Sequence, residues 1–236
     1  QTDCAAQLPS VNVIYEDVWT DPGVRTPDTS FSYRYSQLQT PAPLSPTSPS
    51  TCQTTWSMLC RITIHYPIHL QPLWTLPRLV LDAGGAVIAD RTCVSCHSPA
   101  DAAGAVRVPA GQLDLSGGPS PDEADHFVSY RELLFTDNAQ EVNMGALQDI
   151  LVPGPPDPIT GLPTLVPVPV PPSMSAGSAS GSRAFFFDPP SAGGTARFDL
   201  GGSHPGYLSA AELRLISEWL DIGGQYYNDP FKAPTN

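Results

Sequence analysis

Residues 93–97 read Cys-Val-Ser-Cys-His, which is a C-x-x-C-H motif. This motif is the attachment signature of a c-type haem. Two thiols at this spacing can add across the two vinyl groups of one porphyrin, and the adjacent histidine is then held against the iron as an axial ligand. The motif therefore predicts one covalently bound haem c, with Cys93 and Cys96 as the attachment residues and His97 as the proximal ligand.

Two other readings of a C-x-x-C pair fit this sequence less well. A structural zinc site needs a second pair of ligands at a suitable spacing. Cys52 and Cys60 are separated by seven residues and do not provide such a pair. A thioredoxin-like redox pair would lie between a strand and a helix in a βαβ unit, and the sequence shows no such alternation. We therefore favour haem attachment.

An electron-transfer haem normally takes both axial ligands from the protein. We expect the distal ligand to be His204, which lies in a Gly-Gly-Ser-His-Pro-Gly turn ahead of the last helix. His69 is the second choice and Met174 is the third. A pair of histidines generally gives a lower reduction potential than a His/Met pair, so His204 predicts a low-potential centre. The remaining candidates are His65, His126, Met58 and Met144.

The C-terminal region predicts an amphipathic helix. Ser209 and Glu212 form a capping box, and apolar side chains then recur at helical spacing. Gly223 and Gly224 predict the end of the helix. The segment from Glu212 to Gly223 resembles the last helix of the cytochrome c families, and Ile68 to Leu73 resembles the segment that precedes their haem motif.

The resemblance is to the monohaem cytochrome c domains of hydrazine-synthase-α-like bacterial secreted proteins, and it covers roughly residues 61–228. It implies a mainly α fold with extensive coil, in which a cytochrome c-like helical domain spans 61–236. Residues 1–60 are expected to form an irregular extension with short strands and a Pro/Ser/Thr-rich loop. A Pro-rich insertion at about 150–182 departs from compact cytochromes, and we expect it to be a polyproline II surface loop, with a partner-docking arm as the alternative.

Local patterns predict several further elements. Residues 11–15 and 31–35 are rich in β-branched and aromatic side chains and predict short strands, and residues 60–66 alternate like a strand. Ser120 and Glu123 form a second capping box, which predicts a helix that begins there. The Asp82-Ala-Gly-Gly and Asp114-Leu-Ser-Gly-Gly segments are typical of turns.

Three cysteines, Cys4, Cys52 and Cys60, remain after the haem motif. Haem attachment in bacteria takes place in an oxidising compartment, so we expect a disulfide among them. Cys52 with Cys60 is the favoured pairing, and Cys4 with either is the alternative. We expect a periplasmic or extracellular protein whose start at Gln1 follows removal of a signal peptide. No run of eighteen apolar residues occurs, so no membrane span is expected.

The charge balance narrows the range of partners. Eleven basic residues stand against 23 acidic ones, which gives a net charge of −12, and Lys232 is the only lysine. Nucleic acids and anionic membrane surfaces attract basic patches, so neither is an expected partner. A redox partner steered by charge should present a basic docking face.

Three functions are compatible with one haem in such a chain. The first is electron transfer, in which the protein supplies axial ligands, burial and docking geometry and performs no chemistry on a substrate. The second is a structural haem-containing subunit of an extracellular filament or larger redox complex. The third is an enzyme or gas sensor with an open sixth iron position. We favour the first because several side chains are available as distal ligands.

Overall fold

The computed structural model describes residues 13–15, 21–24, 31–33, 35–43, 55, 62–176 and 204–228. The chain divides into two compact units. One consists of Gln1–Leu70 and Gly177–Asn236 and is called the α7 unit here; the other, Gln71–Ala176, is called the α4 unit. Each unit is described by itself.

Helix α7 (Ala210–Asp221) is the centre of the α7 unit. The expected capping box is confirmed, because the Ser209 hydroxyl accepts from the Glu212 amide and the Glu212 carboxylate accepts from the Ser209 amide. Trp219 is fully buried, and its indole N–H donates to the Gln225 carbonyl at 2.9 Å. Its ring packs on Tyr66, at 5.4 Å between centroids. The sequence thus specifies both the start of this helix and the face that it buries.

The C-terminal end of α7 and the two short strands of this unit were expected from the sequence, whereas the structure of the segment 62–70 was not. Gly223 and Gly224 both have positive φ and end the helix as expected. Strands β1 (Val13–Tyr15) and β2 (Phe31–Tyr33) pair antiparallel, which confirms the expected short strands. Residues 62–66, the described part of the expected strand at 60–66, do not form a strand: Thr63 and His65 lie in isolated bridges, that of His65 with Tyr227, and Tyr66–Leu70 forms a π-helical segment, η3.

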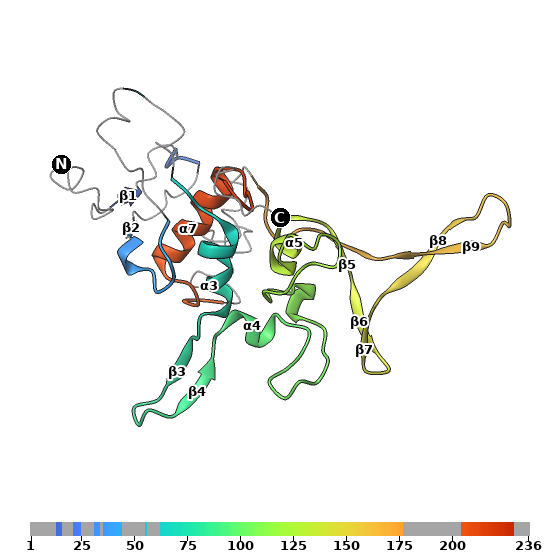
Figure 1. The fold of residues 1–236 in the computed structure, drawn as a ribbon, viewed down its shortest axis with the longest axis horizontal. Helices are drawn as coiled ribbons and strands as arrows, with labels where there is room; N and C mark the ends of the chain where they lie inside the picture. Colours follow the sequence, from blue (N-terminus) through green and yellow to red (C-terminus); the bar gives the residue numbers. More distant parts are fainter. Residues whose placement is uncertain are drawn as a thin grey trace. The chain divides into compact units, whose positions relative to one another are not determined.

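The α4 unit contains three short helices and a series of two-stranded hairpins (Figure 1). Its helices are α3 (Gln71–Thr75), α4 (Cys93–Cys96) and α5 (Val128–Leu134). The hairpin strands are β3 (Leu79–Leu81) with β4 (Val87–Asp90), β6 (Gln140–Asn143) with β7 (Ala146–Asp149), and β8 (Leu151–Pro156) with β9 (Pro163–Pro167). Strand β5 (Asp137–Asn138) pairs with β10 (Pro169–Val170).

The expected mainly α fold is therefore wrong. The described residues are 25% helical and about 24% strand, and their strands form several small antiparallel sheets. The reason lies in the turns. The turns themselves were expected, but the residues on either side of them were not expected to pair as strands. Asp82 shows how they work: its carboxylate accepts from the amides of Gly84 and Ala86, and Gly85 adopts φ +84°, so the chain reverses and β3 meets β4.

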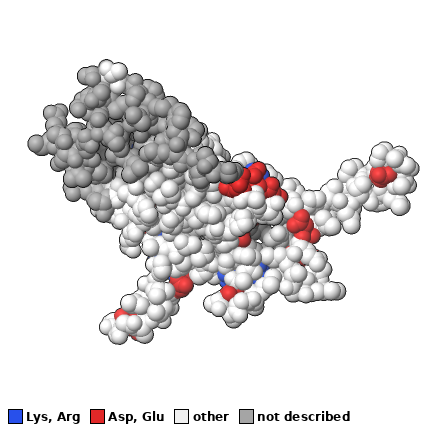
Figure 2. Space-filling view, in the orientation of Figure 1, with Lys and Arg blue, Asp and Glu red and all other residues white. Residues whose placement is uncertain are grey.

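The Pro-rich insertion is also different from the expected polyproline II loop. Its residues from Leu151 to Pro167 form the β8–β9 hairpin, with Val152 paired to Val166. Gly154 permits the strands to approach, because a Cβ there would lie 2.7 Å from the Val166 side chain. On the face drawn in Figure 2, most of the surface of the hairpins is uncharged, and acidic side chains lie at the tips of the β3–β4 and β8–β9 hairpins.

The expected helix beginning at Ser120 is wrong as well. The Ser120 hydroxyl accepts from the Asp122 amide two residues on, which makes a turn instead of a cap. Backbone hydrogen bonds across this loop, such as that from the Val128 N–H to the Gly118 carbonyl, mean that the helix begins only at Val128.

Over the described residues, none of the helices has the length and apolar character needed to cross a membrane.

Candidate haem attachment site

Helix α4 is one turn that presents both thiols of the motif. Cys93 is half-buried, Cys96 is exposed, and neither is in a disulfide. His97 follows as the C-terminal cap, and its amide donates to the Cys93 carbonyl at 2.9 Å. The four-residue helix and its C-cap therefore place three potential haem-binding side chains, from Cys93, Cys96 and His97, within five consecutive residues.

The start of α4 is fixed by the base of the β3–β4 hairpin. The Thr92 hydroxyl accepts from the Arg78 amide at 3.0 Å, and the Thr92 amide donates to the Asp90 carboxylate at 2.8 Å. Hydrogen bonds from the Thr92 side chain and from its amide lower the pKa of Asp90. The Arg78 guanidinium also donates to the Leu73 carbonyl in α3 at 3.2 Å. The motif thus begins at the junction of a hairpin and a helix.

Arg107 holds the other end of α4. Its guanidinium donates to the Ser95 carbonyl at 2.6 Å, to the Ser98 carbonyl at 3.1 Å and to the Ser98 hydroxyl at 2.9 Å. A cation at the C-terminus of a helix satisfies carbonyl groups that lack partners within the helix. Arg107 is therefore the residue that closes the loop after the motif onto the helix.

The His97 ring is oriented by the segment 113–115. Its Nδ1 lies 3.2 Å from the Leu113 carbonyl oxygen, and the Leu115 amide donates to the His97 carbonyl at 2.9 Å. A carbonyl can only accept, so Nδ1 carries the proton and the lone pair of the neutral ring lies on Nε2. Metal-binding histidines typically use this arrangement, in which one nitrogen donates to a carbonyl and the other binds the metal.

The residues present fit a c-type haem. Cys93 and Cys96 lie on one turn of helix and are not joined in a disulfide, as covalent attachment requires. His97 has the tautomer that offers Nε2 to iron. This fit concerns the attachment side and the proximal ligand.

The candidate distal ligands lie in both units. Met174 belongs to the α4 unit together with His97; its side chain is 4% exposed, and its amide donates to the Leu133 carbonyl at 2.8 Å. His204 belongs to the α7 unit, where its ring packs edge-on against Tyr207 at 5.1 Å. His69 also belongs to the α7 unit and is buried.

The ring of His69 is poorly prepared for iron ligation. Its Nδ1 accepts from the His65 amide at 2.8 Å, so the proton of the neutral ring lies on Nε2. Burial and the neighbouring His65 lower the pKa of His69 to about 4, so the ring is neutral. In this tautomer Nε2 has no lone pair for a metal, so the ring would first have to rearrange.

The other candidate axial ligands are either exposed or packed against aromatic side chains. Met144 is fully exposed at the turn of the β6–β7 hairpin. His126 packs edge-on against Tyr130 at 5.0 Å, and its carbonyl accepts from the Ser120 amide. Burial lowers the pKa of His126. His65 packs edge-on against Tyr227. Met58, the three remaining cysteines and any disulfide among them lie outside the described residues.

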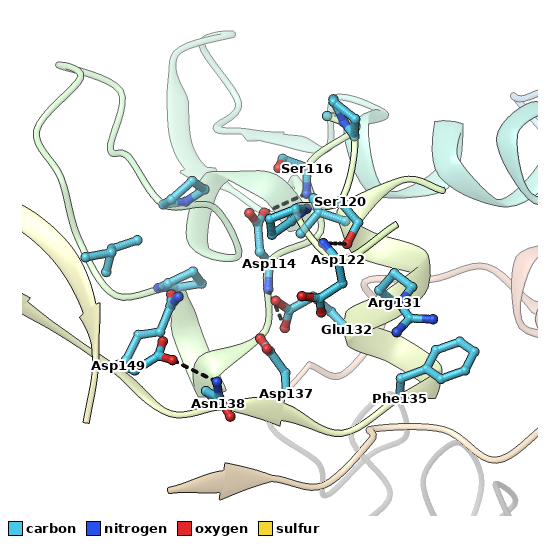
Figure 3. Close-up of a pocket in the computed structure, with 18 of the residues that line it drawn as sticks. Asp114, Ser116, Ser120, Asp122, Arg131, Glu132, Phe135, Asp137, Asn138 and Asp149 are labelled. Atoms are coloured by element: carbon cyan, nitrogen blue, oxygen red, sulfur yellow. Dashed lines mark hydrogen bonds between the residues drawn. The ribbon is translucent and has the colours of Figure 1, made fainter. Parts of the chain in front are cut away.

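A cavity of about 430 Å³ lies beside the segment that orients His97 (Figure 3). Glu132 on α5 and Asp137 on β5 point toward each other at its floor, and the Asp114 amide donates to the Glu132 carboxyl at 3.5 Å. Burial, then the hydrogen bond and charge of Asp137, raise the pKa of Glu132 to about 9. The further acidic side chains in the lining are Asp122 and Asp149.

The cavity does not have the donor geometry of a cation site. Within the described ranges, no three side chains of the His, Cys, Asp or Glu type are grouped so that they could hold a metal ion. Glu132, held neutral at physiological pH, is a hydrogen-bonding group there and supplies no negative charge.

Three parts of the site were not foreseen from the sequence: Arg107, the Leu113 carbonyl and Glu132. Arg107 is a single basic residue in a loop, and its hydrogen bonds carry no local sequence signal. The Leu113 carbonyl is a backbone group. Glu132 lies on the helix whose apolar positions were recognised, but its partner Asp137 lies on strand β5, which was not expected.

Comparison with known proteins adds no relative: no family model, no curated protein and no solved structure matches this chain.

Proposed function

We propose that this protein is an electron carrier with one covalently bound haem c, acting in the periplasm or outside the cell. The observation that carries the proposal is the C-x-x-C-H turn whose histidine donates from Nδ1 to the Leu113 carbonyl. A chance motif on a surface turn has no need of a histidine held in the metal-binding tautomer, whereas a proximal ligand does.

Each residue of the site has a defined part in this proposal. Cys93 and Cys96 would hold the haem through thioether bonds, and His97 would ligate its iron through Nε2. Haem, when bound, supplies an iron that exchanges one electron between the ferric and ferrous states. The Leu113 carbonyl fixes the orientation of the His97 ring, and Arg107 keeps the turn closed. A rigid ligand set lowers the rearrangement that accompanies each electron exchange.

The sixth position would be filled by a side chain of this chain, with His204 as our first candidate and Met174 as the alternative within the α4 unit. Met174 is buried, and a thioether favours ferrous iron and a higher potential than a second histidine. His69 would need a different tautomer from the one that its hydrogen bond imposes. Replacement of His204 or Met174 by Ala separates the two, because loss of the true ligand converts the iron to a high-spin form.

The docking partner in this proposal is a redox protein with a basic face. The chain has a net charge of −12, and acidic side chains are visible at the tips of the β3–β4 and β8–β9 hairpins in Figure 2. Opposite charge on a partner raises the rate of encounter and makes it depend on salt. A rate of electron exchange that falls as salt is added would support this partner class.

The experiment is expression in a host that exports the chain and attaches haem c, followed by optical spectra of the oxidised and reduced protein with and without carbon monoxide. We expect low-spin bands that carbon monoxide does not move. Substitution of Ala at both cysteines should abolish covalent haem, while Ser95→Ala on the same turn serves as the control. A spectrum that shifts with carbon monoxide would instead favour a ligand-binding haem enzyme or sensor.

A second candidate function is that of a haem-containing subunit in an extracellular filament or larger redox complex. The observation that favours it is the β3–β4 hairpin, on which Leu79, Leu81, Val87 and Ile88 are each more than half exposed. Isolated two-stranded hairpins are marginally stable, and exposed apolar side chains on them commonly contact another protein. Measurement of the mass in solution by light scattering distinguishes a single chain from an assembly.

A further inference from the structure

One peptide group joins the His97 ring to the Glu132 carboxyl. The carbonyl oxygen of Leu113 lies 3.2 Å from His97 Nδ1, and the N–H of the same peptide unit, that of Asp114, donates to Glu132 Oε2 at 3.5 Å. All three groups belong to the α4 unit. Peptide groups are polarisable, so hydrogen bonds made on the two sides of one peptide strengthen or weaken together.

We propose that Glu132 is a redox-linked proton site, which takes up a proton when the haem iron is reduced and releases it when the iron is oxidised. The inference rests on the proposed haem function and adds its regulation by pH. Glu132 acts through the Leu113–Asp114 peptide and is therefore a positioning residue for the His97 ring.

The surroundings of Glu132 set the range in which it titrates. Asp137 on β5 shares a hydrogen bond with it, and Asp114 approaches it from the loop. The other charged side chains that line the cavity are Asp122, Asp149 and Arg131. Arg131 lies over the Phe135 ring at 4.0 Å. Burial and the carboxylate of Asp137 raise the pKa of Glu132 to about 9, which is close enough to neutrality for a change in nearby charge to matter.

The direction of the effect follows from charge. A deprotonated Glu132 accepts more strongly from the Asp114 amide, which makes the Leu113 carbonyl oxygen a stronger acceptor for the His97 Nδ1 proton. Nε2 then becomes a stronger electron donor to iron, which stabilises the ferric state. Protonation of Glu132 reverses each change, so the protonated carboxyl favours the ferrous state.

The reaction is balanced by one electron and one proton. The electron comes from the one-electron redox partner, and the proton comes from the solvent by way of the cavity that Glu132 lines. Between the pKa values of Glu132 in the two redox states, reduction forms an O–H bond on its carboxylate, and oxidation breaks that bond again. No other bond forms or breaks.

The test is a titration of the midpoint potential of the haem-loaded protein between pH 6 and 11, with optical spectra recorded to show that ligation stays constant. We expect the potential to fall as pH rises through the pKa of Glu132. A roughly tenfold difference in proton affinity between the two redox states corresponds to a total fall of about 59 mV for a one-electron couple.

Three variants localise the effect. Glu132→Gln keeps the hydrogen-bonding side chain but cannot ionise, so its potential should not change over this range. Asp137→Asn removes the neighbouring charge and should move the transition to lower pH. Asp149→Asn is the matched control: Asp149 lines the same cavity but binds the Asn138 amide at 2.7 Å, so its transition should match that of the wild type.

Infrared spectroscopy gives a readout that does not depend on the potential. The redox-difference spectrum of the wild-type protein should contain a carboxyl C=O band that shifts in deuterated water, and Glu132→Gln should lack it. If haem is attached but the wild type shows neither this band nor a pH-dependent potential, the inference is overturned while the proposed function stands. If no haem is attached at all, the proposed function itself fails.

Discussion

Helices α7 and α4 are held in opposite ways. Helix α7 has 12 residues, a complete capping box and seven buried side chains. Helix α4 has four residues, none of them buried, and its N-cap Thr92 makes no capping bond to the helix. Short helices are unstable on their own, so α4 depends on groups outside it.

Three hydrogen bonds hold the two ends of α4. The Arg78 amide donates to the Thr92 hydroxyl, the Arg107 guanidinium donates to the Ser95 carbonyl, and the His97 ring donates to the Leu113 carbonyl. The helix that stabilises the fold is thus specified by its own sequence, whereas the turn that carries the chemistry is assembled by its neighbours. This difference predicts where substitutions damage the fold and where they damage the function.

The largest effect on stability is expected in α7. Trp219→Ala removes a fully buried indole together with its hydrogen bond to Gln225, and it should lower the free energy of unfolding by about 3–5 kcal/mol. Val94→Ala, on the half-buried surface of α4, should cost less than about 1 kcal/mol. Chemical denaturation of both variants measures the contrast. Equal losses would show that α4 contributes to the core as α7 does.

A smaller effect is expected from Arg107. Replacement by Ala removes three side-chain hydrogen bonds, and at roughly 0.5–1.5 kcal/mol for each bond the loss should be about 2 kcal/mol. Hydrogen exchange at the amides of 95–98 should then be faster in the variant than in the wild type, and this increase should be larger than any increase at the amides of α7. Arg78→Ala is the matched control at the other end of the site. Unchanged exchange in Arg107→Ala would show that the turn holds itself.

The smallest effect is expected at the cap of α7. Ser209→Ala removes the acceptor for the Glu212 amide and should cost about 1 kcal/mol, whereas Ser209→Gly should cost only a few tenths. Thermal unfolding followed by circular dichroism can resolve the two. If Ser209→Ala and Ser209→Gly lower the stability equally, the start of α7 is fixed by packing and not by the cap.

The sequence predicted those elements whose signals are local. The capping box at Ser209 and Glu212, the terminating Gly223 and Gly224, and the Asp82 turn are each set by residues within a few positions of one another. The strands of the α4 unit were missed for a related reason. Proline-rich stretches such as 151–167 were assigned to coil, yet Val152 pairs with Val166 and several prolines occupy paired positions in the hairpin.

The attachment site was predictable only in part. The spacing of Cys93, Cys96 and His97 is visible in the sequence because covalent attachment requires neighbours in the chain. The groups that orient His97 are separated from it by 16 residues at Leu113 and act through backbone atoms, which leave no residue signature. Ser120 shows the opposite error: its capping pattern is present, but its hydroxyl binds the amide two residues on.

The most direct test of the haem proposal is mass spectrometry of the exported protein after denaturation and proteolysis. We predict that the peptide containing Cys93 and Cys96 carries the mass of one haem and that its reduced spectrum is that of a thioether-linked haem. A peptide with two unmodified thiols or a disulfide, from cells that attach haem to a control cytochrome, would contradict the account.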